Sequence, residues 1–272
     1  MFALDDLFSV KGRTALVTGG ATGIGRVCAE ALLSAGARVL IASRKAEACE
    51  AAAKELSAIG PCEGWGGAVN TEDGVKALAA ETRKRTDALH ILVNNAGVTW
   101  GEPFETYPWK AWDRVMSVNV AGLFALTRDL FPDLAAAATA DRPTTVINIG
   151  SVMGTITQSE RSYAYAASKA AVHHLTRILA HEFARRQVTV NAIAPGPFQT
   201  KMTRFAIGDE EGAARGAKTV PMKRIGRADD IAGAVLFLAG RGGAFTTGAI
   251  LPVDGGISVE AAHAMFEEAA PT

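Results

Sequence analysis

Residues 13–36, RTALVTGGATGIGRVCAEALLSAG, decide the fold. Apolar residues 13–18 predict a buried strand and residues 24–35 predict a helix, so the glycine-rich TGGATGIG forms the turn between them. Glycines in such a turn let the backbone approach a pyrophosphate, and the helix start offers free N–H groups and a positive dipole end. Gly19, Gly23 and Gly25 follow T-G-x-x-x-G-x-G rather than G-x-G-x-x-G. Alone, this turn fits a purely structural role as well as a nucleotide site.

Strand-like and helix-like segments alternate along the rest of the chain. Strands are predicted near 14–18, 37–42, 63–69, 89–93, 144–149, 188–194 and 249–252. Helices are predicted near 24–35, 45–59, 72–86, 109–135, 163–186 and 228–240. Such alternation predicts an α/β fold: one doubly wound, Rossmann-type parallel sheet with helices on both faces. We expect residues 1–272 to form a single domain, with residues 196–227 as a substrate lid.

Composition narrows the functional class. The 272 residues carry a formal net charge of +0, so no strong field favours nucleic acid. No apolar run reaches the roughly 18 residues of a membrane span, and the N-terminus lacks the basic region of a signal peptide. The cysteines at 28, 49 and 62 lack metal-ligand spacing, and their odd number indicates reduced thiols. These features predict a cytoplasmic protein without a metal site and without nucleic-acid or membrane partners.

The candidate reaction centre combines three polar residues. Tyr165 and Lys169 in YAASK lie at i and i+4, which places them on one face of a helix. A nearby ammonium favours the phenolate and is expected to lower the pKa of Tyr165. Ser151 closes the apolar run TTVINIGS, where its hydroxyl can polarise a substrate oxygen. We assign Tyr165 as the general acid in reduction. The neighbouring Tyr163 has no Lys four residues later, so we do not expect it to act as the acid.

Six motifs occur in the order typical of one family. TGGATGIG, NNAG at 94–97, Asn119 in SVNVAG, Ser151 in NIGS, YAASK and the PG at 195–196 resemble the short-chain dehydrogenase/reductase family. The resemblance runs from about residue 10 to residue 256. Within the family, SRKAEACE, NNAGVTWGEPFETYP and IAPGPFQTKMTR are most similar to bacterial 3-oxoacyl-(acyl carrier protein) reductases, in particular the subgroup linked to rhamnolipid synthesis.

The resemblance implies further roles for individual residues. Lys169 would hold the nicotinamide ribose, and Asn119 would hold a water that connects Lys169 to solvent. Asn119 also fits a structural hydrogen bond between helices, and it can distort its helix locally. The residues implied to line the cofactor are Gly19, Thr22, Gly23, Ile24, Gly25, Val69, Asn95, Ala96, Gly97, Tyr165, Lys169, Pro195, Gly196, Phe198 and Thr200. The family also implies a homotetramer with helices 109–135 and 163–186 at the subunit interfaces.

The residues after the second predicted strand indicate the cofactor. NAD sites carry an acid there for the ribose 2′-OH, whereas NADP sites carry a basic residue for the 2′-phosphate. Ser43, Arg44 and Lys45 occupy this place, and the first acid is Glu47. We therefore predict NADP(H), although Arg44 could merely start a solvated helix. Ala68 stands where relatives usually carry an Asp for adenine, which leaves the backbone N–H of Val69 for that contact.

The substrate is less sharply defined than the chemistry. Trp100, Phe104, Tyr107 and Trp109 crowd one loop, and Met153, Met202 and Phe205 are candidates for an opposite apolar wall. The same residues also fit internal packing or a subunit contact. We predict reduction of a 3-oxoacyl-like ketone to a secondary alcohol, with an acyl thioester as one candidate substrate. The alternatives are a dehydrogenase of a sugar, polyol or steroid alcohol, and a non-catalytic NADP(H)-sensing protein.

Overall fold

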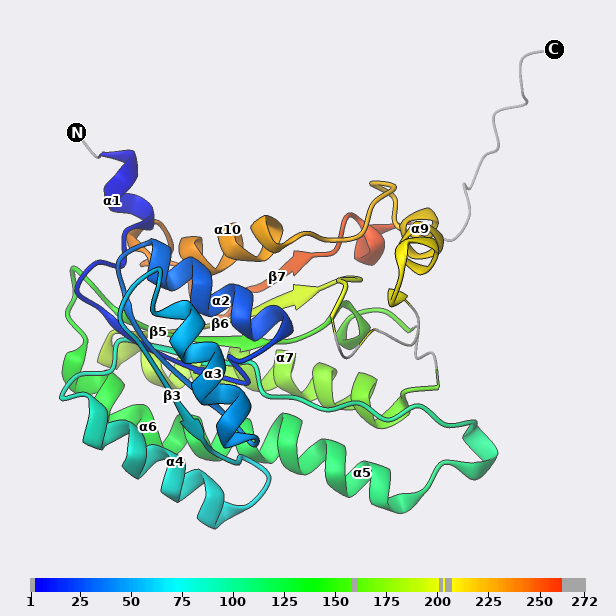
Figure 1. Ribbon diagram of the computed structural model, residues 1–272, viewed down its shortest axis with the longest axis horizontal. Helices are drawn as coiled ribbons and strands as arrows, with labels where there is room; N and C mark the ends of the chain where they lie inside the picture. Colours follow the sequence, from blue (N-terminus) through cyan, green and yellow to red (C-terminus); the bar gives the residue numbers. More distant parts are fainter. Residues whose placement is uncertain (1–2, 158–160, 201–202, 204–206, 261–272) are drawn as a thin grey trace.

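A seven-stranded, all-parallel sheet forms the centre of the computed structural model (Figure 1). The structure describes residues 3–157, 161–200, 203 and 207–260. The strand order is β3-β2-β1-β4-β5-β6-β7. The strands are β1 (Thr14–Thr18), β2 (Arg38–Ser43), β3 (Cys62–Gly66), β4 (Ile91–Asn94), β5 (Thr144–Ile149), β6 (Val188–Pro195) and β7 (Ile250–Val253).

Helices cover both faces of the sheet, because a parallel sheet must bury both (Figure 1). The helices α2 (Gly23–Ser34), α3 (Ala46–Leu56) and α10 (Ala228–Ala239) pack on one face. The helices α4 (Glu72–Arg85), α6 (Leu123–Ala137) and α7 (Tyr163–Phe183) pack on the other. The remaining helices are α1 (Leu4–Phe8), α5 (Trp109–Met116) and α9 (Glu210–Lys218).

Alternating side chains along β1 supply both apolar layers. Ala15 and Val17 face the α2 side, whereas Leu16 faces the α6 side, and all three are fully buried. The predicted fold class is therefore confirmed. The sequence does not predict α1 or α9, because α1 spans only five residues and α9 contains no large apolar residue. The third strand ends at Gly66 rather than at residue 69. The N–H of Gly67 makes the last backbone hydrogen bond between this segment and β2, to the carbonyl of Ser43.

The helix predicted over 109–135 is interrupted. A π-helical segment at Ser117–Gly122 separates α5 from α6. Gly122 lies against the carbonyl of Val69, and a Cβ at this position would collide with that oxygen. A glycine therefore lets the widened turn approach the loop that follows β3.

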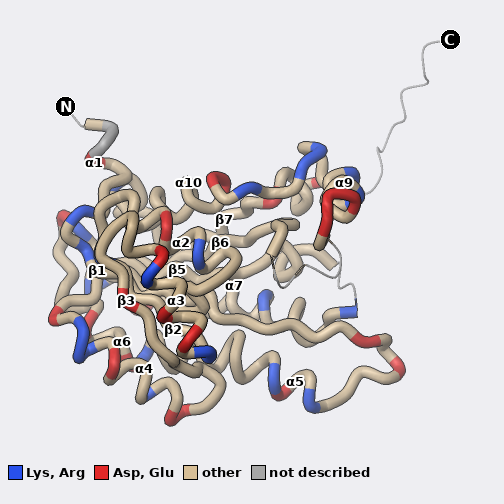
Figure 2. The backbone as a smooth tube through the Cα atoms, viewed as in Figure 1, with Lys and Arg blue, Asp and Glu red and all other residues tan. Residues whose placement is uncertain are grey.

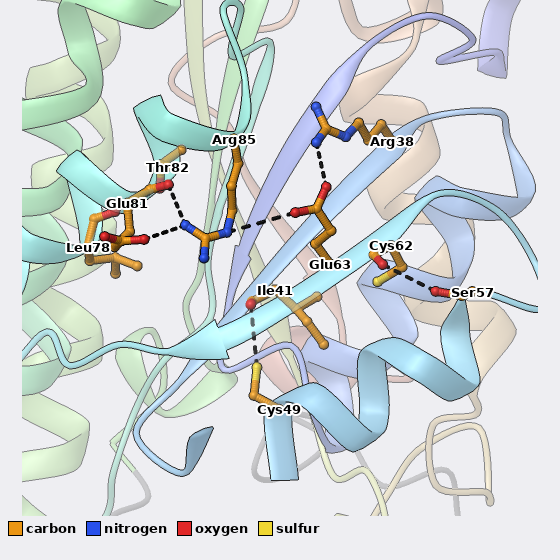
Figure 3. Close-up of polar contacts among 10 residues, drawn as sticks. All are labelled: Arg38, Ile41, Cys49, Ser57, Cys62, Glu63, Leu78, Glu81, Thr82 and Arg85. Carbon is orange, nitrogen blue, oxygen red and sulfur yellow. Dashed lines mark hydrogen bonds and ion pairs between the residues drawn. The ribbon is translucent and has the colours of Figure 1, made fainter. Parts of the chain in front are cut away.

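The edge strand β3 carries a small ionic network (Figure 3). Glu63 pairs with Arg38 of β2 and with Arg85 of α4. Arg85 also pairs with Glu81, and its guanidinium lies 4.4 Å above the ring of Trp65. Exposed ion pairs contribute little stability, but charged side chains on an edge strand disfavour pairing with another chain.

The three cysteines are free, as predicted. Cys28, on the inner face of α2, is fully buried, and burial raises the pKa of its thiol to about 12. Cys49 is also buried, and its thiol points toward the carbonyl of Ile41 at 3.4 Å (Figure 3). Both side chains belong to the apolar core on the α2 side of the sheet.

The segment 196–227 connects β6 to α10. An isolated parallel bridge between Phe198 and Gly226 brings its two ends together, and α9 lies within it. The side chain of Asp209 caps α9 by accepting the N–H of Gly212 at 2.7 Å. Residues 201–202 and 204–206, which include the predicted wall residues Met202 and Phe205, lie outside the described residues.

Acidic and basic residues are interspersed over the backbone, in keeping with the net charge of +0 (Figure 2). Among the helices of the described chain, none combines the length and apolarity that a membrane crossing requires.

The close packing of Gly25 allows a direct stability test. A Cβ at Gly25 would collide with Asn95 Nδ2 and with the carbonyl of Gly19. We expect Gly25→Ala to lower the free energy of unfolding by about 1–3 kcal/mol, because the start of α2 must shift. Gly233 of α10 is the matched control, since it is exposed and a Cβ there meets nothing within 4 Å.

Gly233→Ala should raise the free energy of unfolding by about 0.5–1 kcal/mol, because alanine is the better helix former. Urea unfolding of both variants measures the two effects. Equal changes in the two variants would contradict the packing assigned to Gly25.

Candidate active site

A cleft of about 480 Å³ opens at the carboxyl ends of the strands. Its volume lies within the range of small-molecule sites, roughly 300–1,000 Å³. Most of the predicted site residues line it: Gly19, Thr22, Gly23, Ile24, Ser43, Arg44, Lys45, Val69, Asn95, Ala96, Gly97, Ser151, Tyr165, Lys169, Pro195, Gly196, Phe198 and Thr200. Gly25 and Asn119 do not line it.

The turn between β1 and α2 forms the floor of the cleft. Gly19 and Gly23 have positive φ angles of 67° and 56°, a region that side-chain-bearing residues rarely adopt. Thr22 precedes α2 without capping it through its side chain, so the first N–H groups of the helix remain available to an anion. Gly25 lies beneath this turn, against Asn95, and therefore serves the packing of α2 rather than the cleft surface.

One end of the cleft is basic. Ser43, Arg44 and Lys45 follow β2, and the side chains of Arg44 and Lys45 are exposed. None of the described residues that line the cleft is acidic. Asn70 and Leu78 are among the residues of the cleft that the sequence did not indicate. The helical periodicity of α4 marks Leu78 as apolar and inward, but does not distinguish a core residue from a cleft residue.

The other end of the cleft holds Ser151 and Tyr165. Ser151 follows β5, and its hydroxyl oxygen accepts the N–H of Met153 at 3.2 Å. Tyr165 lies in the first turn of α7 and lines the cleft together with Ser151. Burial raises the pKa of Tyr165, and the nearby hydroxyl of Ser151 partly opposes that rise.

Lys169 stands one turn after Tyr165, and its side chain is buried at the wall of the cleft. Its Nζ donates to the carbonyl of Ile149 at 2.6 Å and lies 5.5 Å from the centre of the Tyr165 ring. Burial lowers the pKa of Lys169 to about 8. The expected lowering of the Tyr165 pKa is therefore not found in this structure, because burial outweighs an ammonium that is directed at a carbonyl.

Asn119 lies within the π-helical segment, and its side chain is buried. Its Oδ1 accepts the N–H of Val98 at 2.9 Å, while its Nδ2 donates to the carbonyl of Val98 and to Ser168 Oγ, each at 3.0 Å. The predicted structural hydrogen bond and the predicted helix distortion thus both occur. Through Ser168, Asn119 joins the loop after β4 to the helix that carries Tyr165 and Lys169.

The segment after β6 closes the same end of the cleft. Gly196 packs on Asp254, where a Cβ would come within 2.8 Å of its backbone. Thr203, which sequence reasoning missed, also lines the cleft. Its hydroxyl donates to the carbonyl of Phe198 at 2.6 Å and accepts the N–H of Thr200 at 2.9 Å. A threonine in a polar loop gives no pattern from which this role could be predicted.

Tyr163 points away from the reaction centre. Its ring packs edge-on against Phe104 and Tyr107, with centroid distances of 5.8 and 5.3 Å. Phe104 and Trp109 are mostly exposed, at 74% and 78%. These aromatic residues do not line the cleft of the reaction centre.

The fold and cleft together define a class of enzyme. An open parallel sheet with a glycine turn at a helix start, and with Ser, Tyr and Lys at the far end of one cleft, is the arrangement of a dinucleotide-dependent oxidoreductase. A family model described as enoyl-(acyl carrier protein) reductase matches residues 19–258. The chain belongs to the short-chain dehydrogenase/reductase family. The predicted family and enzyme class are confirmed.

Individual relatives cover nearly the whole chain. It is 45% identical to the rhamnolipids biosynthesis 3-oxoacyl-[acyl-carrier-protein] reductase of Pseudomonas aeruginosa, over 92% of this chain and 97% of that protein. The Pseudomonas aeruginosa RhlG/NADP active-site complex superposes with a TM-score of 0.91 at 44% identity, covering 93% of this chain and 99% of that one. A gluconate 5-dehydrogenase from Burkholderia cenocepacia, in complex with NADP and tartrate, gives 0.88 at 31% identity, covering 95% and 100%.

A buried histidine lies beneath the loop that carries Ser151. His173, one turn after Lys169 on α7, is 5% exposed and packs against Gly150 and Gly154. Its Nε2 finds no hydrogen-bond partner in the described part of the chain. Burial, followed by the nearby charges of Lys169 and Arg177, lowers the pKa of His173 to about 4.

This pKa predicts an acid-sensitive fold. Below about pH 6.5 the unfolded chain binds a proton at His173 that the folded chain does not, so stability falls between about pH 6.5 and pH 4. We expect His173 to account for a loss of about 2 kcal/mol between pH 7 and pH 5. The loss should shrink in His173→Gln and persist in His174→Gln, whose parent side chain is exposed. Urea unfolding at both pH values measures it, and an identical pH dependence in the two variants would refute the assignment.

Proposed function

We propose that this chain is an NADP(H)-dependent reductase that converts a 3-oxoacyl-type ketone to a secondary alcohol. The observation that carries this proposal is that Ser151, Tyr165 and Lys169 line the same cleft as a basic end at Arg44 and Lys45. The 45% identity with a 3-oxoacyl-[acyl-carrier-protein] reductase supports the substrate class.

NADPH, when bound in this cleft, supplies the hydride. The residues that would hold it are those of the glycine turn for the pyrophosphate, Arg44 and Lys45 for the 2′-phosphate, and the segment from Pro195 to Thr200 for the nicotinamide. The positive φ angles of Gly19 and Gly23, and the uncapped start of α2, fit a pyrophosphate.

The proton steps follow from the geometry of the side chains. Ser151 already accepts the N–H of Met153, so its own hydroxyl proton is available to the substrate oxygen. The raised pKa of Tyr165 keeps its phenol protonated at neutral pH, ready to donate. As the phenol loses its proton, the ammonium of Lys169 stabilises the negative charge from about one helical turn away. Asn119 acts by positioning α7 through Ser168.

A second candidate substrate class is a sugar or polyol. The similarity to a gluconate 5-dehydrogenase favours it, at 31% identity over nearly the whole chain. The same Ser151, Tyr165 and Lys169 would serve that reaction, so only the substrate side of the cleft distinguishes the two. A non-catalytic NADP(H) sensor is disfavoured, because both Tyr165 and Lys169 are present and adjoin the cleft.

The proposal includes a lid over the cleft, a homotetrameric assembly and a cytoplasmic location. Segment 196–227 acts as a lid on a single domain, with its two ends joined at Phe198 and Gly226. The exposed apolar side chains of Trp112, Phe124 and Ile178 support a homotetramer that packs through α5, α6 and α7. The three unbridged cysteines support a cytoplasmic location.

The substrate class is tested with the purified chain and NADPH. We expect a β-keto ester and an acetoacetyl thioester to be reduced at least tenfold more efficiently, in kcat/KM, than any sugar or polyol ketone in the same panel. NADPH absorbance measures turnover. A sugar or polyol ketone that exceeds every β-keto compound would transfer the proposal to the second class.

Tyr165→Phe is the control for the chemistry. It removes the proton donor but no part of the glycine turn, so turnover should vanish while NADPH binding, followed by fluorescence, stays nearly intact. Turnover that survives in Tyr165→Phe would exclude Tyr165 as the acid.

Arg44 is expected to set the cofactor preference. Charge-assisted hydrogen bonds contribute roughly 1.5–3 kcal/mol, so Arg44→Ala should weaken NADPH binding about tenfold or more and leave NADH binding nearly unchanged. Lys54→Ala is the control, because Lys54 is an exposed cation of α3 that does not line the cleft. Equal losses for NADPH and NADH would contradict a contact with the 2′-phosphate.

A further inference from the structure

The loop between β4 and α5 is tied to the catalytic helix by one phenol. Tyr107 lies at the end of this loop, and its hydroxyl donates to the carbonyl of Trp100 at 3.3 Å. The same hydroxyl accepts the backbone N–H of Ala164, also at 3.3 Å. Ala164 immediately precedes Tyr165, so a residue of the loop satisfies an N–H of the turn that carries the proposed acid.

The start of α7 depends on this contact. Ser162 stands at the cap position of α7, but its side chain makes no capping hydrogen bond. Arg161, just before it, has a positive φ of 65°, which is an uncommon conformation for a residue other than glycine. Its carbonyl accepts the N–H of Glu102 at 3.1 Å. The loop thus supplies both a backbone bond and a side-chain cap to a turn that lacks a local cap.

Aromatic packing orients the phenol of Tyr107. Its ring lies edge-on to Tyr163 at 5.3 Å and 83°, and to Trp112 at 6.2 Å and 69°. Tyr163 in turn contacts Phe104 edge-on. These ring contacts hold Tyr107 against two helices, α5 and α7, and they persist if only the hydroxyl is removed.

The other end of the loop is also fixed relative to α7. Val98 lines the cleft, and both its N–H and its carbonyl bond to the side chain of Asn119. Asn119 reaches α7 at Ser168. The loop therefore meets the catalytic helix at two points, Ser168 through Asn119 and Ala164 through Tyr107, which lie on either side of Tyr165 in the sequence.

We propose that Tyr107 is a positioning residue for ketone binding: its hydroxyl holds the carbonyl of Trp100 and the first turn of α7 together, so the loop beside the cleft keeps its place relative to Tyr165. This inference rests on the proposed reductase function. It also assigns Tyr163 as part of the aromatic support of Tyr107 and not as a donor to the substrate.

Tyr107→Phe tests the inference and Tyr163→Phe is its matched control. Tyr107→Phe keeps the ring and removes both hydrogen bonds, whereas the Tyr163 hydroxyl makes none with the described residues. Both contacts are long for hydrogen bonds, so we expect a three- to tenfold rise in KM for the β-keto ester in Tyr107→Phe. NADPH affinity should change less than twofold, and Tyr163→Phe should match the wild type in both.

Hydrogen exchange of the cofactor-free protein gives a readout independent of turnover. The amide of Ala164 should exchange at least threefold faster in Tyr107→Phe and at the wild-type rate in Tyr163→Phe. An unchanged Ala164 amide, or a KM effect equal in the two variants, would overturn the proposal. A wild-type protein that reduces no ketone, yet shows the exchange difference, would refute the proposed function and leave the link between loop and helix standing.

Discussion

The side chains of Thr18 and Asn95 join the carboxyl ends of β1 and β4, the two central strands at which the strand order reverses. Thr18 Oγ1 accepts the N–H groups of Asn95 and Ala96 at 3.1 and 3.0 Å, and donates to the carbonyl of Val93. Asn95 Nδ2 returns bonds to the carbonyls of Thr18 and Gly19. The strand order reverses here: β2 and β3 follow on the far side of β1, whereas β5, β6 and β7 follow on the far side of β4, and ligands bind in the crevice at such a reversal.

The rest of the cleft depends on this junction. The carbonyl of Gly19 is held by Asn95, and the first turn of α2 can reach them only because Gly25 has no Cβ. Beyond Asn95, the chain continues into Gly97 and Val98, which meet the side chain of Asn119. Hydrogen bonds therefore connect this junction both to the glycine turn before α2 and, through Asn119 and Ser168, to α7.

Much of this arrangement could be predicted, because each motif combines a local pattern with a chemical requirement. Alternating apolar segments predicted the sheet, and the spacing of Tyr165 and Lys169 predicted a shared helix face. Effects of burial could not be predicted. The pKa of Tyr165 rises because its surroundings exclude water, and no residue spacing reveals that. Gly25 resembled a ligand contact in sequence, but its function in packing depends on Asn95, seventy residues further along the chain. Loops carry Asn70, Thr203 and Tyr107. A loop has no periodic residue pattern, so the sequence could not predict where these side chains lie.

The pairing of β1 with β4 has a consequence for how the chain reaches its native state. Thr14 and His90, bonded across the two strands, are 76 residues apart in sequence. Closing so long a loop is entropically costly, and parallel pairing over such separations slows folding. The crevice cannot exist until β1, β2, β3 and β4 have assembled, so it forms late. During synthesis, one edge of β4 remains unpaired after residue 94 has been made. It can pair only when β5, which begins some fifty residues later, has been synthesised. The cleft therefore depends on strand pairings that are distant in sequence, whereas the glycine turn from which it starts is local.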